Sequence, residues 1–127
     1  MGTDVEPEGT TSAASFEASP FEVTTDTTGS TPTVRVSGEL DLDTYALLQA
    51  AIRSIELTTT DDLLLDLRNV TFLDSTGLNM LLAEVARARS EGRRLLLVRP
   101  GGPADRIFQL TLLEDRFEFV EGPPDPA

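Results

Sequence analysis

Two short runs of apolar residues most strongly limit the folds open to this chain. Leu63–Leu65 together with Leu67 follows two aspartates, and Leu95–Val98 follows two arginines. Each run is typical of a strand buried on both faces, as the strands of parallel sheets are. Residues 75–90 lie between the runs and place four apolar side chains on one helical face: Leu78, Leu81, Leu82 and Val85. This strand–helix–strand order predicts an α/β unit.

The segment before these runs predicts a hairpin. Phe21 and Val23 alternate with polar residues, which favours a half-buried strand. Val34 and Val36 alternate in the same way, and this second strand should end near Glu39. Residues 28–32, with their glycine and proline, are typical of a turn between the two strands.

A first helix is predicted from about Thr44 to Leu57, with Asp43 as its capping residue. Five apolar side chains form two rows that we expect to face the core: Leu47, Ala51 and Ile55 in one row, and Leu48 and Ile52 in the other. The helix is therefore expected to be amphipathic and to cover one face of the sheet.

The remaining elements follow from glycine, proline and aromatic residues. Gly92 should end the helix of residues 75–90, because glycine accepts the left-handed conformation common after helices. Pro103 should begin a third helix, with Ile107 and Leu110 directed inward. Residues 117–120 predict a short last strand.

Together these elements predict a single α/β domain over residues 19–120. We expect a mixed, mostly parallel sheet of about five strands, with three to four helices packed against it. Residues 1–18 and 121–127 contain few large apolar side chains and many small, polar or proline residues. Such segments cannot bury enough surface to offset their ordering entropy, so both are predicted to be disordered tails.

The composition excludes several classes of function. The chain has no histidine and no cysteine, so the commonest general base and the usual transition-metal ligands are missing, and we expect no metal site and no cofactor. A formal net charge of −12 disfavours nucleic acid and anionic membranes as partners. There is neither a long apolar run nor a signal-peptide pattern, so a cytoplasmic protein is expected.

The stretch from Val70 to Leu78 is the most informative for function. It leads from the central strand into the second predicted helix and contains Asp74, Ser75 and Gly77. The free N–H groups and the dipole at a helix N-terminus favour negative charge. A phosphate on Ser75 would therefore be compatible with the fold, and it would add about −1.5 to −2 charges beside Asp74 at pH 7.

A second polar segment, residues 37–43, lies between the hairpin and the first helix and contains Asp41 and Asp43. In a mostly parallel sheet this loop and the Ser75 loop should lie at the same end of the strands, where ligands and partners bind. Ordinary helix capping is the alternative explanation for both loops, because aspartate and serine are common capping residues.

Taken together, the two loops resemble the STAS-domain family and, within it, the bacterial anti-sigma factor antagonists. The matching stretches are residues 36–41, residues 65–67 leading into 72–78, and residues 108–117, so that the resemblance covers about residues 20–120. Asp-Ser-Thr-Gly-Leu after a buried strand, preceded by Gly-Glu-Leu-Asp, is specific as a pair, whereas either half alone is weak.

The resemblance implies a phosphorylation-controlled binding switch rather than an enzyme. It assigns Ser75 as the phosphoacceptor, with Thr76 less suited, and places Asp41 near it. The unphosphorylated protein would bind an anti-sigma factor, often a serine kinase that supplies ATP, and a phosphatase would reset the cycle. We predict six partner-binding residues, Asp41, Asp43, Asp74, Ser75, Thr76 and Gly77, in a monomer or weak dimer.

One stretch departs from the family pattern. Many relatives have Thr-Gly-Leu after the third helix, whereas this chain has Thr111-Leu112-Leu113. Leucine costs about 1 kcal/mol in the left-handed conformation that glycine accepts there, so this helix end is expected to differ.

Two other functions compete with the switch. A serine hydrolase would need an activating base, but the sequence lacks histidine, lysine and the Gly-x-Ser-x-Gly elbow. A STAS adaptor of a stress-signalling or lipid-transport assembly, without a phosphorylation switch, is the nearer alternative. The serine at position 75 favours the switch.

Overall fold

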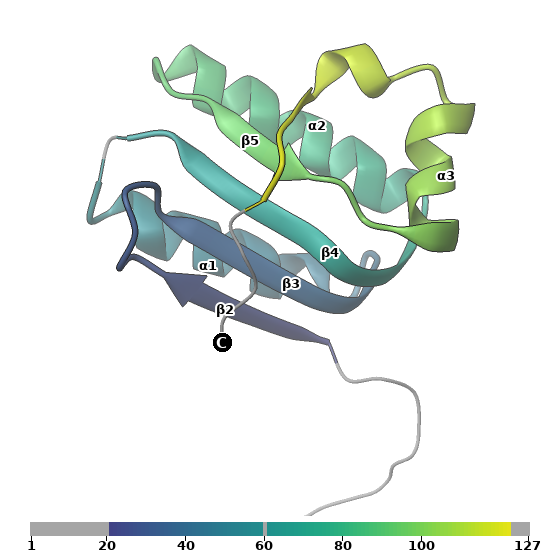
Figure 1. Ribbon diagram of the computed structural model, residues 1–127, viewed down its shortest axis with the longest axis horizontal. Helices are drawn as coiled ribbons and strands as arrows, with labels where there is room; N and C mark the ends of the chain where they lie inside the picture. Colours follow the sequence, from purple (N-terminus) through teal and green to yellow (C-terminus); the bar gives the residue numbers. More distant parts are fainter. Residues whose placement is uncertain (1–20, 60, 123–127) are drawn as a thin grey trace, which may run out of the picture.

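The computed structural model describes residues 21–59 and 61–122. The predicted tail at residues 1–18 lies outside this range, as does all of the C-terminal tail except Glu121 and Gly122, which have no regular secondary structure. Five strands form one sheet in the order β2–β3–β4–β5–β6 (Figure 1). The strands are β2 (Glu22–Asp26), β3 (Thr33–Leu40), β4 (Leu63–Leu73), β5 (Leu95–Val98) and β6 (Glu118–Phe119).

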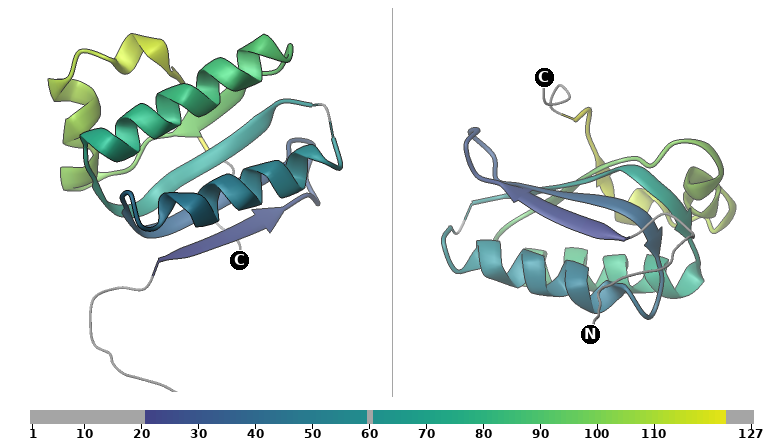
Figure 2. Two further views of the ribbon diagram at one scale, coloured as in Figure 1. Left: turned by 180° about the vertical axis from the view of Figure 1, so that it is seen from behind. Right: turned by 90° about the horizontal axis from the view of Figure 1, so that it is seen from below.

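The sheet is mixed, as predicted. β2 pairs antiparallel with β3, and the other three neighbouring pairs are parallel. The helices are α1 (Tyr45–Glu56), α2 (Ser75–Ser90) and α3 (Gly102–Leu110), and a short 3₁₀ turn covers Glu114–Arg116. α1 and α2 lie side by side on one face of the sheet, and α3 lies beside the end of β4 that leads into α2 (Figures 1 and 2).

The central strand β4 is buried from Leu63 to Leu67, which confirms the two-faced burial predicted from the leucine run. It continues to Leu73, so the residues expected to connect strand and helix are themselves part of the strand. The strand therefore leads directly to Asp74 and α2. Asp66, within the leucine run, is also buried and is neutralised by Arg68 and Arg35, at 2.8 and 3.6 Å.

The start of α1 differs from the prediction. Asp43 is not the cap, because residues 42–44 form a turn and the helix begins at Tyr45. Leu47 is also wrongly predicted as core, since its side chain is 58% exposed. The buried residues of α1 are Tyr45, Leu48, Ile52 and Ile55. At about 100° per residue, Leu47 falls outside the stripe that these four define.

The third helix contains a similar error. Leu110 is exposed rather than inward, whereas Ala104 and Phe108 are buried. Leu110 lies on the side of the helix opposite to these two residues, as the helical repeat of about 100° requires. The ring of Phe108 packs edge-on against Phe117 and Phe119, with ring centroids 5.1 and 5.2 Å apart. This aromatic cluster attaches the C-terminal strand to α3.

After α2 and after α3, the chain contains a residue in the left-handed backbone conformation. Gly92 has φ of 78° and ends α2, as predicted, with hydrogen bonds from Gly92 N–H to the Arg89 carbonyl and from Arg93 N–H to the Ala88 carbonyl. After α3, however, Leu112 adopts φ of 59° and remains exposed. The expected change of geometry at this helix end is therefore wrong: leucine keeps the left-handed conformation.

Candidate functional site

The first turn of α2 presents Ser75 and Thr76 to solvent. β4 ends at Leu73, and Asp74 follows in an extended conformation as the N-cap. The Gly77 N–H donates a hydrogen bond to Asp74 Oδ1 at 2.8 Å. Asp74 is therefore a working helix cap, and its carboxylate lies at the positive end of the helix dipole. Ser75 is the first helical residue and its side chain is exposed.

Gly77 brings this turn against the end of β3. A Cβ atom at position 77 would lie 2.9 Å from the Leu40 carbonyl oxygen and 2.7 Å from Leu73 Cδ1. Contacts under 3.0 Å are too short for a carbon atom beside backbone, so only glycine fits without movement of β3 or α2. The glycine at position 77 is thus explained by packing within the protein itself.

Asp41 organises the turn that follows β3. Its Oδ1 accepts hydrogen bonds from the N–H groups of Asp43 and Thr44 at 3.0 and 3.1 Å. The Asp41 N–H in return donates to Thr44 Oγ1 at 3.0 Å, and the Thr44 hydroxyl donates to the Glu39 carbonyl at 2.7 Å. This reciprocal pattern fixes the loop before α1. Thr44, which sequence reasoning did not single out, is therefore central to the loop.

The two loops lie at the same end of the sheet. Leu40 and Leu73 are Cα partners in the parallel β3–β4 ladder, and the loops that carry Asp41 and Ser75 follow directly from these two residues. The structure therefore brings together the predicted residues of both loops. Ser75, Thr76 and Asp43 are exposed, Asp41 and Asp74 are partly buried, and Gly77 is buried. Partner binding by these residues stays a prediction.

The capping hydrogen bonds of Asp41 and Asp74 match the alternative explanation given by capping chemistry. Hydrogen bonds from backbone N–H groups, however, do not neutralise the charges of the Asp41 and Asp74 carboxylates. None of the ion pairs between described residues involves Asp41, Asp43 or Asp74. This end of the sheet therefore presents negative charge together with an accessible hydroxyl.

A buried polar cluster holds α1 and α2 together behind this site. Glu84 is 3% exposed and accepts a hydrogen bond from Tyr45 Oη at 2.6 Å. Arg87 and Arg53 approach its carboxylate at 3.1 and 3.3 Å. Burial alone would raise the pKa of Glu84, but the hydrogen bonds from Tyr45 and Arg87 hold this pKa below its usual value. Glu84 is therefore ionised and paired.

The cluster continues through Glu56, which pairs with Arg87 at 2.6 Å and with the buried Arg93 at 3.0 Å. Sequence reasoning missed this cluster because glutamates and arginines on helices are usually solvated. One sign was available: Glu84 is three residues after Leu81 and next to Val85, on the apolar face of α2. A carboxylate at such a position needs partners.

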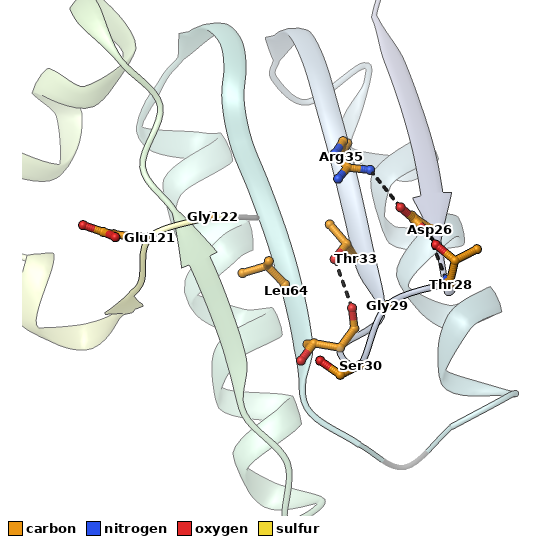
Figure 3. Close-up of a pocket in the computed structure, with 10 residues that line it drawn as sticks. Asp26, Thr28, Gly29, Ser30, Thr33, Arg35, Leu64, Glu121 and Gly122 are labelled. Atoms are coloured by element: carbon orange, nitrogen blue, oxygen red, sulfur yellow. Dashed lines mark hydrogen bonds and ion pairs between the residues drawn. The ribbon is translucent and has the colours of Figure 1, made fainter. Parts of the chain in front are cut away.

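A shallow pocket of about 450 Å³ lies away from these loops (Figure 3). It is lined by the β2–β3 turn, by Thr33 and Arg35 of β3, and by Glu121 and Gly122. Thr33 begins β3, whereas the Ser75 site lies beyond the last residue of that strand. Arg35 is paired with Asp26 at 3.4 Å, so its charge is already balanced within the protein.

Two further features of the described residues bear on function. No group of three or more acidic side chains between residues 21 and 122, residue 60 aside, could hold a metal ion. Within the same residues, no helix has the length and apolar character needed to cross a bilayer.

The fold and the two loops define a STAS domain. A family model described as "Mlab, STAS domain" matches residues 23–121, and the chain belongs to this family. This confirms the resemblance noted in the sequence.

Relatives with named roles are similar over most of the chain. The anti-sigma-B factor antagonist of Staphylococcus aureus is 29% identical over 89 residues, which are 70% of this chain and 82% of that protein. A crystal structure of an anti-sigma factor antagonist from Mycobacterium paratuberculosis is 30% identical, covers 81% of this chain and 87% of its own, and has a TM-score of 0.68.

The anti-sigma factor antagonist SpoIIAA shares the fold. Its unphosphorylated form covers 78% of this chain and 88% of its own, with 20% identity and a TM-score of 0.61. The Bacillus protein has also been solved in its phosphorylated form, with a TM-score of 0.56.

Proposed function

We propose that this protein is an anti-sigma factor antagonist whose binding is controlled by phosphorylation of Ser75. The relatives named as antagonists support the binding role, and the occurrence of SpoIIAA in phosphorylated and unphosphorylated forms supports a phosphorylation switch. The partner would be an anti-sigma factor that is also a serine kinase and supplies the ATP. A phosphoserine phosphatase would restore the free hydroxyl.

The exposed Ser75 hydroxyl at the start of α2, beside the Asp41 turn, is the observation that carries this proposal. An exposed hydroxyl is accessible to a kinase without local unfolding. The N-terminus of a helix also tolerates the added negative charge, so the phosphorylated protein is expected to keep the same fold.

Phosphorylation would act on the surface rather than on the core. It adds about −1.5 to −2 charges at pH 7 next to Asp41, Asp43 and Asp74. Each close like-charge pair costs on the order of 1 kcal/mol in water, and more where a partner excludes water. These repulsions already exist in the free phosphorylated protein, so affinity falls only by the cost that is added when a partner excludes water from the phosphate and the carboxylates. An added cost of about 1.4 kcal/mol corresponds to a tenfold loss of affinity.

The test uses the purified anti-sigma factors of the source organism, one at a time. Each is incubated with the protein and ATP, and the modified residue is mapped by mass spectrometry. Binding is then measured for the unmodified protein and for the enzymatically phosphorylated protein, which is a better reagent than Ser75→Asp. Ser75→Ala and Thr76→Ala are matched variants, because both remove an exposed hydroxyl from the same helical turn.

We expect phosphate on Ser75, none in Ser75→Ala, and ordinary phosphorylation of Thr76→Ala. The phosphorylated protein should bind at least tenfold more weakly than the unmodified protein. Equal affinities of the two forms, or modification at another residue, would contradict the proposal.

A second candidate is an adaptor that binds its partner without a switch, in a stress-signalling or lipid-transport assembly. The description of the matching family model, "Mlab, STAS domain", is the observation that keeps this candidate open. Under this alternative the protein would bind a partner whose affinity does not change when Ser75 is phosphorylated. The same binding measurements therefore discriminate between the two functions.

Catalysis by Ser75 has less support. The sequence contains no histidine or lysine that could activate the hydroxyl. The named relatives are antagonists. A binding protein that receives a phosphate, rather than an enzyme, is accordingly the proposed class.

A further inference from the structure

Two large apolar side chains are exposed at the end of the sheet that carries Ser75. Leu42 is 68% exposed and Phe72 is 45% exposed. Leu42 is two residues after Leu40, and Phe72 is one residue before Leu73, and Leu40 and Leu73 are paired across β3 and β4. Leu42 thus lies in the turn that contains Asp41, and Phe72 is the last residue but one of β4, three residues before Ser75.

Neither side chain is needed to fill the core at this position. Leu40 and Leu73 already supply buried side chains at the ends of β3 and β4. Leu42 lies within the turn fixed by the Asp41–Thr44 hydrogen bonds, so its backbone is held while its side chain remains in water. An apolar side chain on a fixed backbone is well suited to bind a partner, because little ordering entropy is lost on contact.

The charged residues within the two segments that carry these side chains are all of one sign, whereas the neighbouring helix α3 carries the exposed Arg106. Residues 36–52 and 69–86 contain no arginine or lysine, whereas they include Glu39, Asp41, Asp43 and Asp74 near the two loops. No described ion pair neutralises these four carboxylates. A complementary partner therefore presents apolar surface to Leu42 and Phe72 and basic side chains to the surrounding carboxylates.

We propose that Leu42 and Phe72 are the apolar anchors of the docking surface, and that the occupant is an anti-sigma factor with an apolar pocket bordered by arginine or lysine. This inference rests on the proposed function and assigns residues to it. A few side chains that fill pockets of the partner carry most of the binding energy of an interface, and the contacts around them exclude water. Leu42 and Phe72 are the large exposed apolar side chains available for this role near Ser75.

The anchors also give a physical reason for release. Packing of Leu42 and Phe72 into a partner removes water from the surface on which Ser75 lies. A phosphoryl group is bulky and strongly hydrated, so it would be forced into a contact from which water is excluded. The apolar anchors supply affinity, and the Ser75 hydroxyl at the start of α2 controls it.

The test compares exposed apolar residues inside and outside this surface. Leu42→Ser and Phe72→Ser are measured beside Leu57→Ser, a matched control, because Leu57 is 89% exposed and lies at the opposite end of α1 from Leu42. The probe is the anti-sigma factor of the source organism that binds the wild-type protein most tightly. Thermal unfolding of each variant checks that these exposed changes leave the fold intact.

We expect Leu42→Ser and Phe72→Ser each to weaken binding by about tenfold, as loss of an interface anchor does. Leu57→Ser should bind within about twofold of wild type. Affinity of the wild type should fall as salt is raised from about 50 to 300 mM, because the charges at the border of the contact are screened.

The outcomes separate this inference from the proposed function. Wild-type affinity in both anchor variants, together with release on Ser75 phosphorylation, would overturn the inference and leave the proposed function standing. Anchor variants that weaken binding, together with no effect of Ser75 phosphorylation, would support the anchors and overturn the switch. If no anti-sigma factor binds the wild type, the proposed function fails and the inference fails with it.

Discussion

The protein contains two acidic regions that differ in what surrounds their carboxylates. Behind the sheet, between α1 and α2, Glu84 and Glu56 are paired with arginines and largely removed from water. At the end of β3 and β4, Asp41 and Asp74 accept hydrogen bonds from backbone N–H groups, and no arginine is paired with them in the described residues. The first region has its charge balanced internally and the second does not.

Under the proposed function, this difference separates a region that serves stability from a region that serves recognition. A buried pair contributes to folding mainly because removing one member leaves the other charged and unpaired. A carboxylate that only caps a turn stabilises that turn modestly, and its charge stays available to a partner. Mutations in the two regions should therefore differ in effect. We expect large losses of stability in the first region, and small losses of stability with changed binding in the second.

The largest effect is expected for Glu84→Ala. This change leaves Tyr45, Arg53 and Arg87 without their shared acceptor. We expect the free energy of unfolding to fall by about 3 kcal/mol or more, as is typical when a buried ion pair is broken. Urea unfolding measures it. A loss similar to that of a surface glutamate would show that the cluster is not a stabilising unit.

Gly77→Ala should be the next most destabilising change. The new methyl group would meet the Leu40 carbonyl and Leu73 at less than 3.0 Å, so β3 and α2 must separate slightly. We expect a loss of about 1–3 kcal/mol, the usual range for overpacking. Gly29→Ala is the control, because nothing lies within 4 Å of a Cβ there. Equal losses in the two variants would argue against the close contact.

Asp74→Ala removes the cap of α2 and tests how much the second acidic region, at the end of β3 and β4, contributes to stability. The Gly77 N–H loses its acceptor, so we expect a loss of about 1 kcal/mol. Asp43→Ala is the matched control, since this exposed carboxylate makes no ion pair among the described residues, and it should change stability by less than about 0.5 kcal/mol. A large loss in Asp43→Ala would break the proposed separation of the two regions.

The smallest expected effect is on the pH dependence of the free energy of unfolding. The pKa of Glu84 is lowered in the folded protein, so its charged form stabilises the fold above its ordinary pKa of 4.5. This stabilisation is lost as the pH falls through the lowered value. The difference in unfolding free energy between wild type and Glu84→Gln should therefore shrink as the pH is lowered from 7 toward about 3. A difference that stays constant would show that the carboxylate charge does not matter.

Much of the fold was predictable because burial and periodicity act locally. The leucines of β4 and β5 show their two-sided burial directly in the sequence, and Gly92 shows the end of α2. The shared end of the two candidate loops could also be anticipated, since parallel strands end at the same edge of a sheet, and the structure adds the pairing of Leu40 with Leu73. The relative position of the two candidate loops follows from this pairing.

The errors arise where several positions satisfy the same pattern. Leu47 and Leu110 have the right spacing for a core face, but helix orientation depends on the sheet beneath, which a single helix sequence does not contain. Leu112 shows that leucine can adopt a left-handed backbone after a helix even though its side chain stays exposed. Glu84 was missed because its partners come from distant parts of the chain. The structure adds mainly these long-range contacts.

The contact of Gly77 with the Leu40 carbonyl has one further consequence. Because the first turn of α2 rests on the backbone of β3, the two loops cannot drift apart without breaking the central ladder. Phosphorylation of Ser75 would then take place on a backbone that is held rigidly against β3. Under the proposed function, a partner would detect the added phosphate itself rather than a change of shape, and phosphorylation and dephosphorylation could be repeated without refolding of the domain.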